Sequence, residues 1–337
     1  MKPVQNEISA DILIIHTGAL GDIICALKAI ECVFSKNWID FCCQGHIFPV
    51  LKVLPNIRNV IDINHSIMRY AFMSEYSSEL KDWLKNYQWV LLISFSEEWE
   101  KSFSKYDLNI VRIPPRPPID EIIHTTRFLL DQFHLQTWIP INSSDIQNFI
   151  LQKKTRSYTT SIDSGGKSIY IHPGSGSSFK NWPIERYILL AKHLQQQNNF
   201  VQWILGPAEC ELKNILIQND VTSENILQTN KMNRVMHVLS QADHYIGNDS
   251  GISHLAAYIG IDTTVIFGPS DFRRWHPIGP FVKTIPDQIP ICLPCFEKGI
   301  RKCSHKKCLN DITVSKVMTT IENSNFMMNT DSHFLSK

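Results

Sequence analysis

The chain has 337 residues, 43% of them hydrophobic and 19% charged, so it can bury the cores of two ordinary globular domains. Its formal net charge of +1 excludes the global positive field of many nucleic-acid-binding proteins, and we expect no nucleic-acid partner. Nine cysteines in a chain of this length do not indicate a disulfide framework.

Strand-like and helix-like runs alternate along the first half of the chain. The opening apolar stretch holds His16 and Asp22 and has no positively charged lead, so it predicts neither a secretory signal nor a membrane span, and we expect a cytoplasmic protein. Apolar residues recur after it with the spacing of one helix face. The expected strands are Asp11–Ile15, Ile39–Cys43, Val60–Ile63 and Trp89–Phe95, and a helix is expected over about Asp120–Phe133.

A second α/β pattern follows a polar stretch, residues 143–167, that reads as a linker. The sequence therefore predicts two similar α/β domains, 1–160 and 168–310, each with a parallel sheet and helices on both faces. Ligands of such sheets bind beyond the carboxyl ends of the strands, and we expect a cleft between the domains. The expected strands are Ser168–His172, Phe200–Leu205, His244–Gly247 and Thr263–Phe267, and the expected helices are Ile184–Leu194, Glu209–Ile217 and Ile252–Tyr258.

The first candidate motif is GALGD, residues 18–22, between the first strand and the first helix. Its glycines allow a tight turn and a close approach to a ligand. Asp22 falls in the first helical turn, where an acidic residue is also favoured by the helix dipole alone. The dinucleotide fingerprint needs G-x-G-x-x-G and only G-x-x-G is present, so NAD binding is poorly supported.

The second candidate motif is HPGSGSSFKNWP, residues 172–183, after the first strand of the second domain. Small residues such as Ser175 and Gly176 expose backbone N–H groups that can hold phosphate oxygens, and Lys180 adds a positive charge. Pro183 suits the first turn of the helix that follows. The alternative is a plain turn with a solvated lysine, but this composition favours phosphate binding.

The third candidate motif is GNDSGISH, residues 247–254, again between a strand and a helix. Asp249 or Ser250 can cap the helix, and the N–H groups around Gly251 can form an anion site. A simple N-cap is the alternative interpretation. Ser250 does not fit the G-x-S-x-G elbow of a hydrolase. His254, near the helix start, is by itself more typical of a structural hydrogen-bonding residue than of a catalyst.

Four cysteines near the C-terminus could bind a structural metal. Their spacing is not that of the usual zinc sites, so free thiols are the expected state. The basic residues among them suggest either a solvated loop or contact with an acidic acceptor. The zinc candidates are Cys292, Cys295, Cys303 and Cys308, and the basic residues are Arg301, Lys302, Lys306 and Lys307.

Four blocks, in order, resemble glycosyltransferase family 9, the ADP-heptose:lipopolysaccharide heptosyltransferases. ILIIHTGALGDIICALKAI resembles the N-terminal signature of the family, and IHPGSGSSFKNWPIERYILLAKHL resembles its donor-phosphate segment. LSQADHYIGNDSGISHLAAYIGIDTTVIFGPSDFRRWHPIGP and CLPCFEKGIRKCSHKKCLNDITVSKV resemble its C-terminal signature and its cysteine-bearing segment. His16 departs from the family, because many members have Arg or Lys there.

The resemblance implies a GT-B fold, in which two Rossmann-like domains face a central cleft and a C-terminal helix, here about 313–323, crosses back to the first domain. It implies an acceptor-binding first domain, a nucleotide-sugar-binding second domain, and inverting transfer from ADP-L-glycero-β-D-manno-heptose to the lipopolysaccharide inner core. It implies no catalytic metal or cofactor. Asp22 becomes the general base, and the implied donor-binding residues are Ser175, Gly176, Lys180, Asp249, Ser250, Gly251 and His254.

The implied acceptor is a lipid A–Kdo core glycolipid, so we expect peripheral contact with the inner face of the inner membrane. Arg69, Tyr70 and Phe72 are candidates for that contact, although Tyr and Phe are more often core residues. Three alternatives stay open: a family member with another nucleotide sugar or acceptor, an NAD-dependent oxidoreductase on Rossmann domains, and an inactive sugar-binding protein. The presence of both Asp22 and Lys180 argues against the last.

Overall fold

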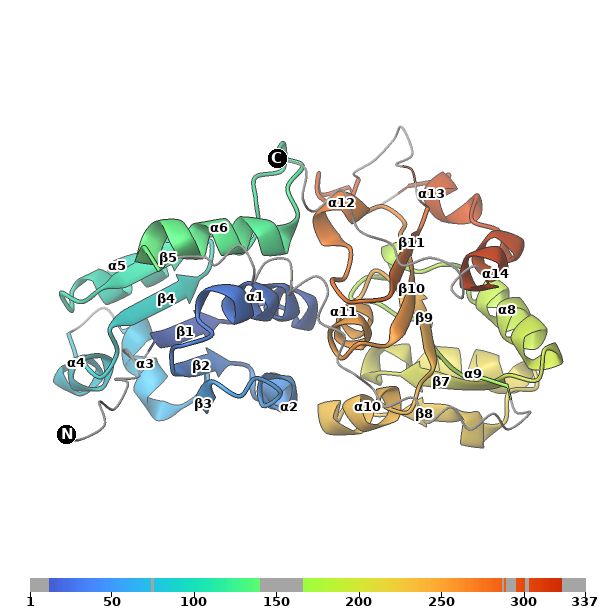
Figure 1. Cartoon of the computed structure of the whole chain (residues 1–337), viewed down its shortest axis with the longest axis horizontal. Helices are drawn as coiled ribbons and strands as arrows, with labels where there is room; N and C mark the ends of the chain where they lie inside the picture. The colour runs from blue at the N-terminus through green and yellow to red at the C-terminus, as the bar shows by residue number, and fades with distance from the viewer. Residues whose placement is uncertain are drawn as a thin grey trace, which may run out of the picture. The chain divides into compact units, whose positions relative to one another are not determined.

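Two separate β-α alternations along the sequence form two parallel sheets. The computed structural model describes residues 12–73, 76–139, 166–286, 288, 295–300 and 303–322. Contacts between these residues divide the chain into two units. Unit 1 contains 12–117 and 125–139, and unit 2 contains 118–124 and the described residues from 166 onward. The elements of both units are labelled in Figure 1.

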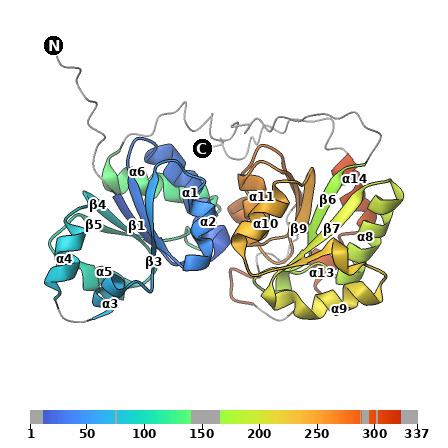
Figure 2. The ribbon, with the colours of Figure 1, turned by 90° about the horizontal axis from the view of Figure 1, so that it is seen from below.

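Unit 1 is a five-stranded parallel sheet in the order β3-β2-β1-β4-β5. All five residues of β1 are buried, as expected for a strand with helices on both faces. Figure 2 shows α1 and α6 on one face and α3, α4 and α5 on the other. The elements are β1 Ile12–His16, α1 Leu20–Val33, β2 Ile39–Cys43, η1 Gly45–Ile47, α2 Phe48–Leu51, β3 Ile57–Asp62, α3 Ser66–Phe72, α4 Ser78–Leu84, β4 Trp89–Ile93, α5 Glu97–Ser104, β5 Ile110–Ile113 and α6 Thr125–Thr137.

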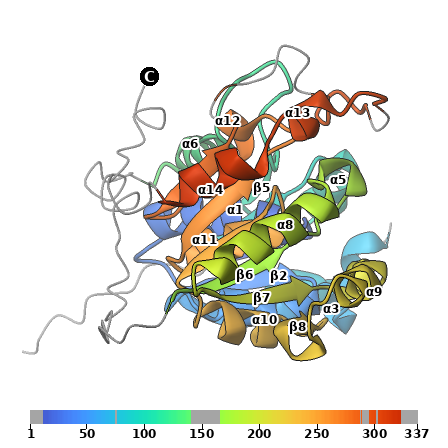
Figure 3. The same cartoon turned by 90° about the vertical axis from the view of Figure 1, so that its right-hand side faces the viewer.

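Unit 2 is a six-stranded parallel sheet in the order β11-β10-β9-β6-β7-β8. Figure 3 shows α8 and α14 side by side on one face. The first elements are β6 Ser168–His172, η2 Ser178–Lys180, α8 Ile184–Gln196, β7 Phe200–Leu205, η3 Pro207–Glu209, α9 Cys210–Gln218, η4 Ser223–Asn225 and β8 Ile226–Gln228. The remaining elements are α10 Met232–Leu239, β9 His244–Asn248, α11 Gly251–Tyr258, β10 Asp262–Ile266, α12 Phe272–Trp275, β11 Val282–Ile285, α13 Lys307–Asn310 and α14 Val314–Glu322.

Both sheets have the strand order of a Rossmann-like unit, which confirms the predicted α/β fold. The order reverses between β1 and β4 in unit 1 and between β6 and β9 in unit 2. Loops that leave the carboxyl ends of these strands diverge, and this is where ligands bind in such folds. The motif of residues 18–22 follows β1, the motif of 172–183 follows β6, and the motif of 247–254 follows β9.

The C-terminal helix differs from the sequence expectation. We expected a helix at about 313–323 to join the first domain, but α14 packs against α8 of unit 2. Its buried Val317 and Ile321 belong to the hydrophobic core of unit 2. Lys283 Nζ also donates to the Thr320 carbonyl at 3.0 Å. Burial of this apolar face therefore assigns the helix to unit 2.

The expected helix over Asp120–Phe133 begins five residues later, at Thr125. Residues 118–124 are not helical, and they pack in unit 2 although they lie between two elements of unit 1. The carbonyls of Pro118, Ile119 and Glu121 accept from Arg274 Nη1 instead of from a following helical turn. Residues 143–165 of the predicted polar linker lie outside the described residues.

Candidate functional site

The strongest candidate site lies at the point in unit 2 where the strand order reverses. Lys180, from η2 after β6, donates from Nζ to Asp249 Oδ2 at 3.0 Å, just after β9. The two side chains are 14% and 9% exposed, so the ion pair is mostly shielded from solvent. The Lys180 ammonium also lies 5.0 Å from the centre of the Phe296 ring, within the range of a cation–π interaction. The structure thus brings two predicted donor-binding residues into direct contact.

Asn248 holds the loop after β6 against the end of β9. Its Oδ1 accepts hydrogen bonds from the Trp182 backbone N–H and the Tyr187 hydroxyl, both at 2.9 Å. Its Nδ2 donates to the Pro173 carbonyl at 2.7 Å. Asn248 is completely buried. Sequence reasoning missed this residue, although an Asn at the end of an apolar strand was a usable signal.

Ser175 fixes the conformation of its own loop. Its Oγ lies 2.6 Å from Asn181 Oδ1 and 2.7 Å from the Ser177 carbonyl, and it accepts from the Ser177 N–H at 3.2 Å. Gly176 is exposed, and a Cβ placed on it would meet no atom within 4 Å. The loop therefore presents an open backbone, while the Ser175 hydroxyl is used inside the loop.

Position 174 requires glycine because the Glu209 side chain lies close to its backbone. A Cβ at this position would overlap the carboxylate of Glu209, which itself accepts from the Gly206 N–H at 2.6 Å. Glu209 is buried, so its carboxylate cannot swing into solvent without a rearrangement. Sequence reasoning did not identify Glu209 as part of this loop environment.

The amino terminus of α11 forms the other wall of the site. Ser250 is its N-cap, and the Ser250 side chain accepts from the Ser253 N–H at 3.3 Å. Ser250 and Gly251 thus stand where a helix presents its first N–H groups and the positive end of its dipole, whereas the Asp249 N–H donates to the Ile266 carbonyl at 3.1 Å. An anion placed here meets these N–H groups and the Lys180 ammonium together.

His254 is an uncharged neighbour of the Lys180–Asp249 pair. Burial lowers its pKa to about 4, against the opposing effect of the Asp249 carboxylate. The Lys180 ammonium also lowers this pKa. Near pH 7 the imidazole is therefore neutral, and it can donate or accept a hydrogen bond without adding charge.

Asp22 follows β1 of unit 1, just as the loop that holds Lys180 follows β6 of unit 2. It occupies the first turn of α1, is half-buried, and its Oδ2 accepts from the Ala19 N–H at 3.3 Å. A Cβ on Gly18 would lie 2.6 Å from His16 Cε1 and 3.1 Å from Asp22 Cβ, so only glycine fits between these two side chains. His16 is buried, and burial lowers its pKa to about 4. The residue beside Asp22 is therefore neutral.

The C-terminal cysteines do not form a metal cluster in the part of the chain that the structure describes, where no three His, Cys, Asp or Glu residues gather suitably. Cys295, Cys303 and Cys308 instead line a cavity of about 230 Å³ together with His305. Hydrogen bonds from the backbone of Lys306 and His305 lower the pKa of Cys303. The fourth zinc candidate, Cys292, lies outside the described residues.

Sequence comparison finds one family along most of the chain. The model described as glycosyltransferase family 9 (heptosyltransferase) matches residues 90–307. Lipooligosaccharide heptosyltransferase 2 of Campylobacter jejuni is 27% identical over 167 residues in one strain and 26% over 166 residues in another. Each match covers 48% of this chain and 52% of the relative, so the chain spans about half the length of the curated relatives it matches.

Solved structures extend the likeness in fold over almost the whole chain. Escherichia coli ADP-heptose lipopolysaccharide heptosyltransferase II has a TM-score of 0.67 at 15% identity, covering 93% of this chain and 98% of its own. A family 9 glycosyltransferase of Veillonella parvula has a TM-score of 0.67 at 16% identity, covering 94% and 97%. Escherichia coli heptosyltransferase WaaC with ADP has a TM-score of 0.62 at 17% identity, covering 93% and 99%. At these identities the structures show the shared GT-B-type α/β fold.

Proposed function

We propose, because this chain belongs to glycosyltransferase family 9, that it transfers heptose from ADP-L-glycero-β-D-manno-heptose to the lipopolysaccharide inner core. The observation that carries the proposal is the Lys180–Asp249 pair beside the amino terminus of α11, at the point where the strand order of unit 2 reverses. Two independent anion-binding features meet there: an ammonium group and a helix N-terminus. The similar Escherichia coli enzyme was solved with ADP, which supports a nucleoside diphosphate as the ligand.

The donor diphosphate would compete with Asp249 for Lys180. The carboxylate is 3.0 Å from the ammonium, and the approaching phosphate oxygens offer the same charge-assisted hydrogen bond. The open backbone at Gly176 and the first turn of α11 would supply further N–H donors. Ser175 shapes this loop, and neutral His254 borders it.

In the proposed reaction Asp22 is the general base. The acceptor hydroxyl oxygen forms a bond to the anomeric carbon while the bond from that carbon to ADP breaks. The hydroxyl proton passes to the Asp22 carboxylate, and the electron pair leaves with ADP, whose added charge Lys180 stabilises. A single displacement of this kind inverts the anomeric configuration.

The proposed acceptor is a lipid A–Kdo core glycolipid, which places the enzyme at the inner face of the inner membrane as a peripheral protein. None of the helices in the described ranges has the length and apolar content of a membrane span. Arg69 is exposed on α3, whereas Tyr70 packs partly against the core of unit 1. Arg69 is therefore the better-placed member of the expected contact, and the Phe72 side chain lies outside the described residues.

Two alternatives rank lower. A family member that uses another nucleotide sugar or another acceptor would retain the same Lys180 site. A nicotinamide-dependent oxidoreductase disagrees with the family match and with the missing G-x-G-x-x-G fingerprint.

Calorimetric titration with ADP tests the donor site. We expect the wild-type protein to bind ADP and Lys180→Ala to bind at least about tenfold more weakly, because a charge-assisted contact to phosphate is removed. Lys192→Ala, at an exposed position of α8, is the matched control and should bind as the wild type does. A folded wild type that does not bind ADP would remove the donor assignment, and UDP- and GDP-linked sugars would be titrated next.

A further inference from the structure

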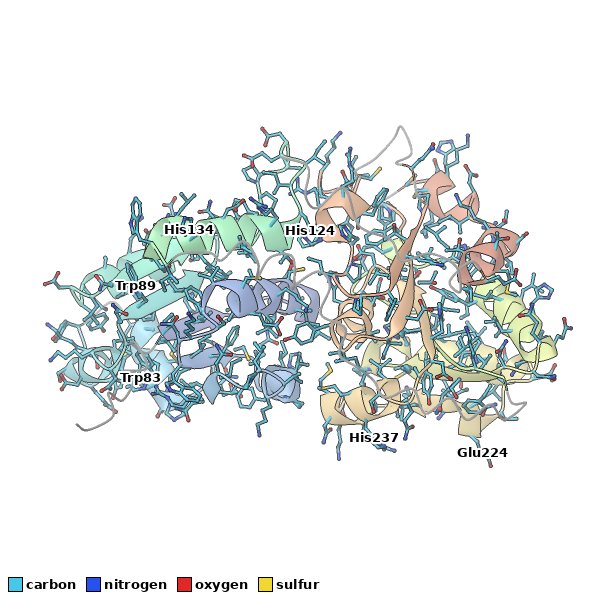
Figure 4. All side chains as sticks on the ribbon, viewed as in Figure 1. Trp83, Trp89, His124, His134, Glu224 and His237 are labelled. Atoms are coloured by element: carbon cyan, nitrogen blue, oxygen red, sulfur yellow. The ribbon has the colours of Figure 1, made fainter. Side chains whose placement is uncertain are left out.

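Residues 118–124 form an exposed strap that is held on unit 2. The strap connects β5 to α6, both elements of unit 1. Positions 118–123 are all exposed, including the apolar Ile119 and Ile122, and only His124 is buried. Figure 4 labels His124 immediately before α6. Burial of apolar side chains therefore does not explain why positions 118–123 follow unit 2.

Arg274 binds the backbone of this strap. The residue lies in α12 and is 2% exposed. Its Nη1 lies 2.8 Å from the Pro118 carbonyl, 2.9 Å from the Ile119 carbonyl and 2.9 Å from the Glu121 carbonyl. One guanidinium nitrogen thus lies within hydrogen-bond distance of three carbonyl oxygens. A lysine side chain ends one bond earlier than the Nη1 of arginine, so its ammonium would fall short of these carbonyls from the same backbone position.

A second contact holds the end of the strap. His124 Nε2 lies 2.8 Å from the His276 carbonyl, and the two imidazole rings are 4.4 Å apart with an angle of 60° between their planes. Burial lowers the pKa of His124 well below its usual value, and the rings of His276 and His254 act in the same direction, against the opposing effect of the hydrogen bond to the His276 carbonyl. The strap therefore ends in His124, a buried and neutral imidazole that packs against the partly buried His276.

This group borders the Lys180–Asp249 pair. His254 is buried in the first half of α11, and it interacts electrostatically with Asp249, Lys180 and His276. Arg274 and His276 are two residues apart at the end of α12. Contacts thus join the strap to His124 and His276, and electrostatic interactions link these two residues to His254 and to the Lys180–Asp249 pair of the proposed phosphate site.

We infer that Arg274 is a positioning residue for the donor site: by fixing the strap on unit 2, it holds His124 and His276 in place beside His254. This inference rests on the proposed function, because it is the nucleoside diphosphate of the donor that the site would bind. Arg274 does not touch the ligand in this scheme. Its effect reaches Lys180 and Asp249 through the three histidines.

The test compares two adjacent arginines of α12. Arg274→Lys keeps the charge but shortens the side chain by one bond, and Arg273→Lys makes the same change at a residue that pairs with Asp271 at 2.7 Å and is 42% exposed. We expect Arg274→Lys to weaken ADP binding at least about tenfold in calorimetry while Arg273→Lys stays within about twofold of wild type. Circular dichroism melting checks that both variants are folded.

A second variant approaches the strap from its other end. His124→Leu removes the hydrogen bond to the His276 carbonyl with a side chain of similar volume, and it should also weaken ADP binding. If Arg274→Lys and His124→Leu both fold and bind ADP as the wild type does, Arg274 is only structural and the inference is wrong. If one of the two variants fails to fold, the ADP binding of the other decides.

Histidine NMR distinguishes a failure of the Arg274 inference from a failure of the donor-site assignment. In protein labelled with ¹³C-histidine, the inference requires the His254 ring signal to shift in Arg274→Lys and to stay unchanged in Arg273→Lys. If wild-type protein does not bind ADP, the donor assignment fails, and the inference is then judged by this signal alone. An unchanged His254 signal in folded Arg274→Lys overturns it.

Discussion

At the scale of single residues, the candidate site depends on side chains that hold loops as much as on those that could touch a ligand. Asn248 is the clearest case, because one buried amide binds the Trp182 N–H, the Tyr187 hydroxyl and the Pro173 carbonyl. A buried amide that serves both neighbouring segments leaves the loop little freedom. Lys180 and Asp249 can therefore meet at 3.0 Å even though 69 positions separate them in the chain.

Asp22→Asn tests the general base. Asn can still accept from the Ala19 N–H, so the start of α1 should be preserved, but it cannot take the proton of the acceptor hydroxyl. We expect turnover of ADP-heptose with a core glycolipid acceptor to fall by roughly 10² to 10⁴-fold. ADP affinity should be unchanged, because the proposed donor residues belong to unit 2. A folded variant with near-normal turnover would contradict the assignment of Asp22.

At the scale of elements, strand positions were readable from the sequence because buried parallel strands are short runs of Ile, Leu, Val and aromatic residues. The expected strands Ile39–Cys43, Ser168–His172 and Phe200–Leu205 match the structure at both ends. The edge strands β5, β8 and β11 were missed. They are three or four residues long and only partly buried, so they carry little apolar pattern.

The candidate site was predictable only in part. Glycine and serine loops after strands identified Ser175, Gly176, Lys180, Asp249, Ser250 and Gly251, because such loops have a local signature. The roles of Asn248, Arg274 and Phe296 depend on contacts between segments far apart in the chain. Arg274, for example, binds carbonyls more than 150 positions away. A backbone carbonyl carries no sequence signal, so this contact could not be read from residue types.

Gly174→Ala tests the packing of the loop after β6 against η3. The new methyl group would overlap the buried Glu209 carboxylate, and we expect a loss of about 1–3 kcal/mol in the free energy of unfolding. Gly176→Ala is the matched control two positions along, where a Cβ meets no atom within 4 Å, and its stability should stay within about 0.5 kcal/mol of wild type. Urea unfolding measures both.

The Glu209→Ala background identifies the cause. If the clash with the carboxylate is responsible, Gly174→Ala should cost less in that background than in wild type, and the two changes should not be additive. Equal costs in both backgrounds would show that Gly174 is needed for another reason.

At the scale of the whole molecule, the chain does not complete unit 1 before it enters unit 2. It enters unit 2 at residue 118 and returns to unit 1 at residue 125. The strap at 118–124 belongs to unit 2 although unit 1 continues after it with α6. The α14 helix, expected on the first domain, completes the core of unit 2 instead. Unit 2 thus contains the whole proposed donor site together with the segments that hold it. Donor binding should therefore respond to changes in the strap, as the Arg274 variants test.

Buried neutral histidines in both units give the molecule a common sensitivity to acid. Burial lowers the pKa of His16 in unit 1 and of His254 in unit 2 to about 4, and it also lowers the pKa of His172. An unfolded chain has histidine pKa values near 6.5, so below that pH it binds protons at histidines that stay neutral in the folded chain. The stabilising effect is therefore complete above pH 6.5 and is lost as the pH falls from 6.5 towards 4.

His16→Gln measures the share of one histidine in this effect. A shift from 6.5 to about 4 corresponds to about 3 kcal/mol, so the wild-type free energy of unfolding should fall with pH between 6.5 and 4 by up to about 1.4 kcal/mol per pH unit more than that of the variant. Urea unfolding at several pH values in this window gives both slopes. His193→Gln, at an exposed position of α8, controls for the loss of a histidine as such. Parallel slopes for wild type and His16→Gln would mean that the His16 ring gains a proton without unfolding. The packing of the His16 ring against Gly18 would then have to open in acid, and Asp22 would have a charged imidazole as its neighbour.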